Sequence, residues 1–274
     1  MTKPTTADGY SLHQLQAARG ACYDLATAIS EMLPEVVIVG GLVPSLLIDQ
    51  EKAAGEAHVG TTDLDLGLQV GLLRDAHYRR LASRLSDHGF RPATDEAGEP
   101  VRHRWVSTAR GALIDFLVPR RSHRKGELVA VDDNLAAIAT PGLDLAFQDR
   151  IWVPFDESWP VSGRPLPQLP VCGPAAFVLL KALAFHNRKE NKDAYDIDYV
   201  LRHFGESVDE INARLKPLLD DVVAQEAVGY LRQDFAQMDS IGPSRAAAFL
   251  GRQDDDAFRA DVADLVQRLL RGLR

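Results

Sequence analysis

The sequence predicts an α+β protein in two parts, a mixed α/β domain over residues 1–171 and an all-helical domain over residues 172–274. Up to about residue 170, short β-branched and apolar runs alternate with stretches of helical spacing, which is typical of a sheet combined with helices. From Pro174 onward, apolar residues recur at helical intervals as far as the C-terminus, and proline suits the first turn of a helix. The change of pattern places the boundary near residue 171.

The first helix is expected between Ser11 and Pro34, because Ser11 and Gln14 have the spacing of a capping box and apolar residues recur at helical intervals. The run Val36–Val39 predicts a buried strand that enters a tight turn at Gly40 and Gly41. The further elements expected are a short helix from Pro44 to Ile48, a strand from Asp63 to Gln69, a helix from Leu73 to His88 stopped by Gly89, and strands at 102–107 and 112–118, with weaker strand-like pieces as far as about residue 170.

Composition excludes some classes of protein. The formal charge of −8 over 274 residues argues against a surface coated with basic residues for duplex DNA, although a local basic run lies at 120–125. No apolar run is long enough to span a bilayer, and the N-terminus has no signal-peptide core. The only two cysteines, Cys22 and Cys172, argue against a disulfide framework. A cytoplasmic protein is therefore expected.

A pair of carboxylates is the first candidate for chemistry. Residues two apart on a strand point to the same side, so Asp63 and Asp65 are expected to project together. Two such carboxylates repel each other unless a cation lies between them, and Mg²⁺ prefers oxygen ligands of this kind. A solvated strand face is the competing interpretation of the same pattern.

Asp115 is the third carboxylate, and all its neighbours in the strand Ala112–Val118 are apolar. A charge in such a strand is costly unless it is paired or bound to a metal ion. Together with Asp63 and Asp65, it predicts a metal site for two Mg²⁺ ions. An edge-strand charge or a salt bridge to a nearby arginine is the alternative.

The Gly40–Gly41 turn joins a strand to a helix, so its backbone N–H groups are expected to approach phosphate oxygens. Taken alone, a Gly-Gly pair is mostly just a turn. Thr61 and Thr62, which precede the carboxylate pair, complete the expected nucleotide-binding set on this part of the chain.

Lys181 interrupts a helix that is apolar on all sides, so we expect it to be buried between the two domains. A lysine in that position either extends to solvent or meets an anion, and a triphosphate would be such an anion. Asp193 and Asp196 follow at the start of the next helix. One interpretation makes Asp193 the N-cap and places Asp196 in the first turn, and a compatible one has Asp196 orient Lys181 or the nucleotide.

These motifs together resemble the DNA polymerase β-type nucleotidyltransferase superfamily and, within it, the AbiEii family, the toxins of type IV toxin–antitoxin systems. The resemblance covers roughly residues 36–204, and its most specific parts are Thr61–Asp65 and Lys181 with Lys192–Asp196. It implies a polymerase β-like domain with a mixed sheet, followed by the helical domain. It also implies that Asp63, Asp65 and Asp115 bind Mg²⁺, that Lys181 contacts phosphate and that Asp196 supports catalysis.

The resemblance further implies the transfer of a nucleotide from an NTP with release of pyrophosphate, in some members to the 3′ end of tRNA, and restraint by a cognate antitoxin. One departure is visible, because relatives often carry an arginine shortly before the Thr-x-Asp-x-Asp motif and this chain offers only His58. If that arginine binds phosphate or acceptor, His58 or the basic run would have to replace it.

An RNA acceptor is the first expectation. Its binding residues would lie in the basic run after the Asp115 strand, at Arg120, Arg121, Arg124 and Lys125. A solvated charged loop is the more common role of such a run. The alternatives are a small-molecule nucleotidyltransferase of the aminoglycoside-modifying type and a pseudoenzyme that binds nucleotide without chemistry.

Overall fold

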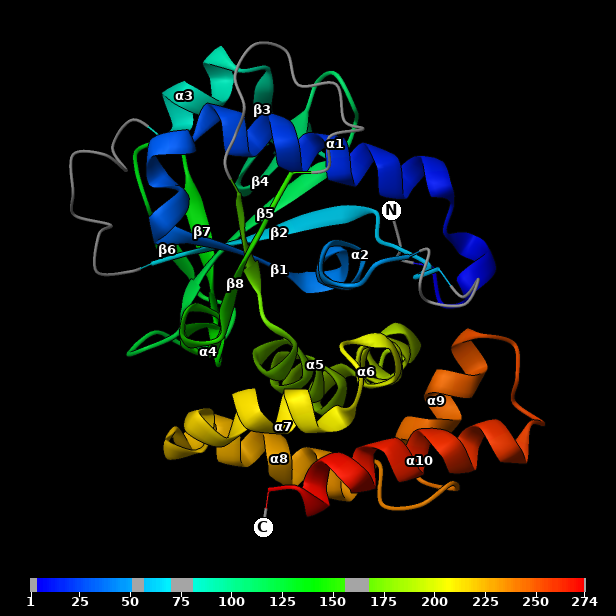
Figure 1. The fold of residues 1–274 in the computed structure, drawn as a ribbon. Helices are drawn as coiled ribbons and strands as arrows, with labels where there is room; N and C mark the ends of the chain where they lie inside the picture. The colour runs from blue at the N-terminus through cyan, green and yellow to red at the C-terminus, as the bar shows by residue number, and fades with distance from the viewer. Residues whose placement is uncertain (1–3, 51–56, 70–80, 156–167, 274) are drawn as a thin grey trace. The chain divides into compact units, whose positions relative to one another are not determined.

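The computed structural model describes residues 4–50, 57–69, 81–155 and 168–273 (Figure 1). The chain divides into two compact units, which we call the sheet unit and the helical unit. The sheet unit comprises Leu12–Val43 and Gly60–Cys172, and the helical unit comprises Met1–Ser11, Pro44–Val59 and Gly173–Arg274. The chain therefore leaves the sheet unit after Val43 and returns at Gly60, a crossing that the predicted single boundary near residue 171 did not include.

Within the described residues, the sheet unit is built on a mixed nine-stranded sheet with the order β3-β4-β5-β2-β1-β9-β8, in which β7 pairs with β5 and β6. Its centre combines an antiparallel β1–β2 pair with parallel β2–β5 and β1–β9 pairs. The strands are β1 (Val36–Val39), β2 (Asp63–Leu68), β3 (Phe90–Thr94), β4 (Pro100–Ser107), β5 (Leu113–Pro119), β6 (Leu128–Ala130), β7 (Ala136–Thr140), β8 (Arg150–Val153) and β9 (Leu169–Cys172).

Helices of this unit cover opposite faces of the sheet. Helix α1 (Leu12–Ala28) lies across one face, where Ile38 and Leu66 contribute to a small apolar cavity beneath it (Figure 1). On the other face a side chain at Gly67 would meet Val37 and Leu143, so α4 (Leu143–Gln148) covers that side. Since strand side chains alternate, Asp63 and Asp65 share the α4 face with Gly67. The short α3 (Leu81–Asp87) precedes β3.

Within residues 173–273 every element is a helix, and these helices form most of the helical unit. Helix α5 contacts α6, α7 and α8, while α6 also contacts α9 and α10. The bounds are α5 (Pro174–Arg188), α6 (Asn191–His203), α7 (Val208–Leu215), α8 (Val222–Asp234), α9 (Ile241–Phe249) and α10 (Asp256–Arg271), and α2 (Val43–Leu47) begins the segment inserted from the N-terminal half. Among the described helices, none is both long and apolar enough to cross a membrane.

Most predicted elements are found with small shifts of their ends, but the first helix ends at Ala28, and a 3-10 helix over Ser30–Glu35, which contains Pro34, follows it. The strands at 36–39, 63–69, 102–107 and 112–118 are present, and the chain after Pro174 is helical as expected. Gly89 ends α3 with a φ of +81°, whereas the expected helical residues 73–80 lie outside the described residues. Helix α4 was not predicted. The N-cap of α6 is Glu190 rather than Asp193, because the helix begins three residues earlier than its aspartate pattern suggested.

Candidate active site

Two acidic residues and one arginine form a row across three neighbouring strands of the sheet unit. Asp65 of β2 is the register partner of Asp115 of β5, which is in turn the register partner of Arg104 of β4. Register partners project to the same face, and Asp63 lies two residues before Asp65 on that face. The structure thus brings the three predicted carboxylates onto one face of adjacent strands.

Gly40 leaves the space that the Asp65 carboxylate occupies. A Cβ at Gly40 would lie 1.9 Å from Oδ2 of Asp65, and Gly40 has a φ of +76°, a conformation that favours glycine. The Gly40–Gly41 turn follows β1 as predicted, and residues 40–42 form a single 3-10 turn before α2. Gly40 is therefore required by the carboxylate beside it as well as by the turn.

Thr61 fixes the orientation of the first carboxylate. Its hydroxyl donates to Oδ1 of Asp63 at 2.8 Å, and both side chains are buried. The neighbouring Thr62 is half-buried at the start of β2. Sequence reasoning grouped both threonines with the nucleotide, and the geometry adds that Thr61 acts on Asp63 directly.

Arg104 holds Asp115 through two hydrogen bonds. Its Nε and Nη2 donate to Oδ1 and Oδ2 of Asp115, each at 2.6 Å. The hydrogen bond to Asp115 raises the pKa of Arg104, and the charges of Asp115, Asp63 and Asp65 act in the same direction. Of the two interpretations of Asp115 from the sequence, a salt bridge to a nearby arginine is the one present here.

The donor set suits a hard divalent cation, since carboxylate oxygens are the ligands that Mg²⁺ prefers. When Asp63 is counted with the row, three carboxylates and one guanidinium give it a formal excess of two negative charges. In the described part of the chain, however, no three acidic, histidine or cysteine side chains converge closely enough to hold one ion. Both oxygens of Asp115 accept from Arg104. The residues fit a metal ion by their chemistry and by the face that they share.

A second cluster of charges lies in the helical unit, around Lys181 of α5. Its ammonium group is 3.0 Å from Asp193 and 2.7 Å from Asp196, and its side chain is 11% exposed. Arg188 also binds Asp193, and Lys192 binds Asp196. The sequence predicted an anion for Lys181, and these two carboxylates on α6 are the anions that the structure places beside it.

Burial and neighbouring charges act in opposite directions on the pKa values of this cluster. Burial alone would lower the pKa of Lys181, but the charges of Asp196 and Asp193 raise it above its ordinary value. Burial alone would raise the pKa of Asp196, but Lys181 and Lys192 hold it well below its ordinary value. Among the described residues, the cations of Lys181, Lys192 and Arg188 meet the carboxylates of Asp193 and Asp196.

His58 is part of the same cluster. Its Nε2 is 2.8 Å from Oδ1 of Asp196, and both side chains are fully buried. The ring stacks on Tyr195 with 5.4 Å between centroids and meets Tyr199 edge-on at 4.9 Å. Burial lowers the pKa of His58 to about 4, so the ring is neutral near pH 7. His58 therefore supports Asp196 and is not exposed for an acceptor.

The basic run lies in the turn between β5 and β6 of the sheet unit. All four of its cationic side chains are exposed, namely Arg120, Arg121, Arg124 and Lys125. Arg120 donates to the carbonyl of His123, and Glu127 accepts from the backbone of Arg124 and from His123. The loop is thus folded on itself with its charges outward.

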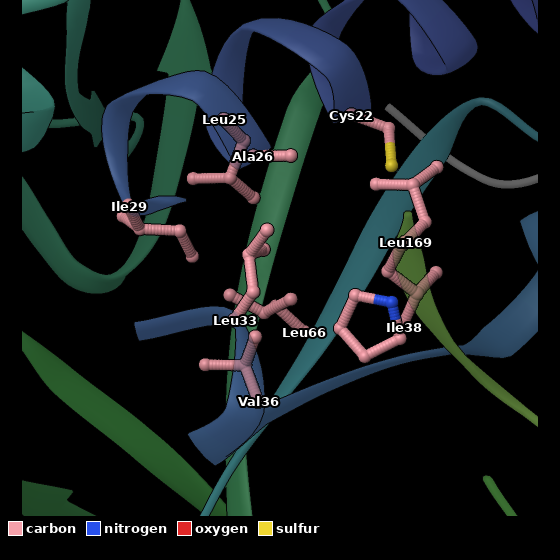
Figure 2. Close-up of a pocket in the computed structure, with 10 residues that line it drawn as sticks. Cys22, Leu25, Ala26, Ile29, Leu33, Val36, Ile38, Leu66 and Leu169 are labelled. Carbon is pink, nitrogen blue, oxygen red and sulfur yellow. The ribbon is translucent and has the colours of Figure 1, made fainter. Parts of the chain in front are cut away.

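The cavity beneath α1 is apolar and too small for a substrate (Figure 2). Cys22, Leu25 and Ala26 of α1 and Ile29 just after it line, with Leu66 and other sheet residues, a space of about 10 Å³, roughly the size of one water molecule. Both cysteines are free and buried, and burial raises the pKa of Cys22 to about 12. Neither the cavity nor the thiol is a reaction site.

The predicted site residues thus form two groups, the carboxylates with their glycine turn in the sheet unit and Lys181 with Asp196 in the helical unit. Sequence reasoning missed Arg104 as a member of the first group. It named His58, but not as a partner of Asp196. Alternation along β4 places Arg104 on one face, but only the β4–β5 register reveals its partner.

In a comparison with protein families, residues 51–274 match the model of the nucleotidyl transferase AbiEii toxin of type IV toxin–antitoxin systems. The matched range includes both groups of charged residues and the helical C-terminal residues beyond 205, while the Gly40–Gly41 turn precedes it. A comparison with curated proteins finds no match.

Proposed function

Because the chain belongs to the AbiEii family of nucleotidyl transferase toxins of type IV toxin–antitoxin systems, we propose that it transfers an NMP from an NTP to an RNA hydroxyl, at the 3′ end of tRNA. The family also implies an antitoxin partner that restrains the enzyme. The observation that carries the proposal is the row of carboxylates on one face of β2 and β5, with Asp65 and Asp115 in register.

The sheet unit carries the carboxylates that we propose for metal binding. Asp63 and Asp65 would hold Mg²⁺, with Asp115 as the third ligand, and the bound ion would neutralise triphosphate charge and orient the reacting oxygens. Thr61 keeps the Asp63 carboxylate in one orientation through its 2.8 Å hydrogen bond. Gly40 keeps the space that Asp65 needs. These residues contribute mainly by positioning, which is where most of the rate gain in such transfers arises.

The helical unit carries Lys181, the cation that we propose for phosphate binding. Asp193 and Asp196 hold its ammonium group in place from two sides. In the reaction, a bond forms between the acceptor oxygen and the α-phosphorus while the bond to pyrophosphate breaks. Lys181 would stabilise the phosphate charge, as a preorganised cation does in phosphoryl transfer.

The exposed basic run of the β5–β6 turn is the proposed contact with RNA. Its four cations follow the strand that carries Asp115, which places them in the same unit as the carboxylates. Phosphate contacts of this kind contribute affinity without base specificity.

The test of the proposed function is incubation of the purified protein with each α-labelled NTP, Mg²⁺ and total tRNA. Wild type should label tRNA with one or more NTPs, whereas Asp63→Ala and Asp65→Ala should lose about 100- to 1,000-fold in rate. Asp24→Asn is the matched control, because Asp24 pairs with Arg110 in the same unit and lies outside the row. Circular dichroism should show all variants folded.

Other outcomes separate the alternatives. Label on small hydroxyl compounds but not on RNA would indicate a small-molecule nucleotidyltransferase. Nucleotide binding without transfer by the wild type would indicate a pseudoenzyme. Full activity of both aspartate variants would contradict the site assignment itself.

The RNA contact has its own test. Reversing the charge of Arg120, Arg121 and Arg124 to glutamate should raise the KM for tRNA and leave kcat nearly unchanged. Arg91→Glu, an exposed arginine on β3, serves as the control. Equal KM values for the triple variant and the control would indicate that the basic run is a solvated loop that does not contact tRNA.

A further inference from the structure

The Arg104–Asp115 pair differs from ordinary surface ion pairs of this chain. The Asp115 side chain is only 9% exposed, and Arg104 forms a two-bond fork with it while remaining 39% exposed. A buried carboxylate needs a compensating charge, and a bidentate arginine is a strong one. The pair joins β4 and β5 at a position where their register aligns the two residues.

The same guanidinium acts on all three carboxylates. Asp65 is the register partner of Asp115, and the charges of Asp63 and Asp65 both act on Arg104. The arginine therefore reduces the negative charge of the row in the metal-free protein. It also occupies both oxygens that Asp115 could offer to an ion.

A divalent cation and this guanidinium would share the two oxygens of Asp115, each of which already accepts one N–H. A metal ion at Asp115 would meet a guanidinium charge on the same carboxylate, and release of one or both hydrogen bonds would relieve that repulsion. The exposure of Arg104 allows it to turn toward solvent when released, whereas the carboxylate is held by its buried strand. The two cations thus repel each other at one carboxylate.

We propose that Arg104 is an internal counter-ion that exchanges with the divalent cation at Asp115 and thereby sets the affinity of the site for metal. This inference rests on the proposed function, since it assumes that the three carboxylates bind a metal ion. Arg104 is then a positioning residue, which keeps the carboxylate in one conformation until metal arrives and lowers the affinity for metal alone.

The test is a Mn²⁺ titration without NTP, followed by electron paramagnetic resonance of the free ion. Arg104→Ala should bind Mn²⁺ about tenfold more tightly than wild type, the scale on which groups around the ligands change metal affinity. Arg104→Lys, which keeps the charge but loses the fork, should fall between them. A purely structural role for Arg104 predicts no gain.

Arg110→Ala is the matched control. Arg110 also forms a two-bond pair with an aspartate of the sheet unit, Asp24, and its side chain is 33% exposed. Its removal should leave the Mn²⁺ affinity unchanged. In an Asp115→Asn background, Arg104→Ala should also lose most of its effect, because the shared carboxylate is gone.

A second measurement uses the wild type alone and does not depend on the folding of any variant. Mg²⁺ titration followed by nuclear magnetic resonance of the arginine Nε–H groups should shift the Arg104 signal and speed its exchange with water. The Arg110 signal should stay in place.

The outcomes separate this inference from the proposed function. Mn²⁺ binding that Asp63→Ala abolishes but Arg104→Ala leaves unchanged would overturn the exchange and keep the metal site. Absence of Mn²⁺ binding in both wild type and Arg104→Ala would overturn both. Binding that appears only in Arg104→Ala would support the exchange in its strongest form.

Discussion

Replacement of His58 by glutamine should remove a pH-dependent part of the protein's stability. The ring is buried against Asp196, and burial lowers its pKa to about 4, against an ordinary value of 6.5. Lys192 and Lys181 disfavour its protonation further. Glutamine can still donate a hydrogen bond to Asp196, but it cannot titrate.

The sign and size follow from linkage. The unfolded chain binds a proton at His58 below about pH 6.5, and the folded chain does so only near the lowered value, so stability is lost as pH falls through this window. With the shift from 6.5 to about 4, the loss between about pH 7 and about pH 5 is roughly 2 kcal/mol. The window lies above the range in which Asp196 is protonated, since its pKa is held well below the ordinary value.

The assay is urea unfolding at several pH values, followed by far-ultraviolet circular dichroism. This signal reports mainly on helices and therefore on the helical unit, which contains His58. Tryptophan fluorescence would be less suitable, because all three tryptophans fall in the sequence range of the sheet unit. The free energy of unfolding should fall by about 2 kcal/mol more in wild type than in His58→Gln between pH 7 and pH 5. His88→Gln, at an exposed position, should behave like wild type. Equal pH slopes for wild type and His58→Gln would refute the reasoning.

Two further predictions concern single residues of the two groups. Gly40→Ala should lower both NMP transfer and Mn²⁺ binding, because the new Cβ would lie 1.9 Å from Oδ2 of Asp65 and would displace that carboxylate. The control is Gly98→Ala, where φ is also positive but no atom lies near the new Cβ. It should cost about 1 kcal/mol of stability without loss of activity. Urea unfolding of Lys181→Met should show a loss of about 3 kcal/mol, because two buried carboxylates lose a cation. Lys125→Met, on the exposed loop, should show almost none, and a similar loss in both lysine variants would argue against the buried network.

The parts of the fold that depend on local patterns could be predicted from the sequence. Asp63 and Asp65 alternate with buried leucines, and that alternation by itself indicates both the strand and the face that the two carboxylates share. The apolar run around Asp115 indicates its strand in the same way. The roles that the resemblance implies for these residues remain predictions.

Long-range pairings could not be predicted in this way. His58 meets Asp196 across 138 residues, and no spacing rule connects them. Arg104 was one of several arginines near Asp115, and only the antiparallel register of β4 and β5 selects it. The same applies to Asp193, whose carboxylate turns to Lys181 and Arg188 instead of capping its own helix.

The division of the chain into interleaved units has a consequence for its synthesis. The ribosome releases residues 44–59 long before the helices that they pack against. The hydrogen bond between His58 and Asp196 therefore cannot form until Asp196 has emerged. The sheet likewise lacks β9, the neighbour of β1, until Cys172 is made. Truncation after residue 172 would leave the inserted segment exposed, with Gln50 and Val59 deprived of their tyrosine partners. The nascent chain therefore cannot assemble the cluster around Lys181 until α6 has been made.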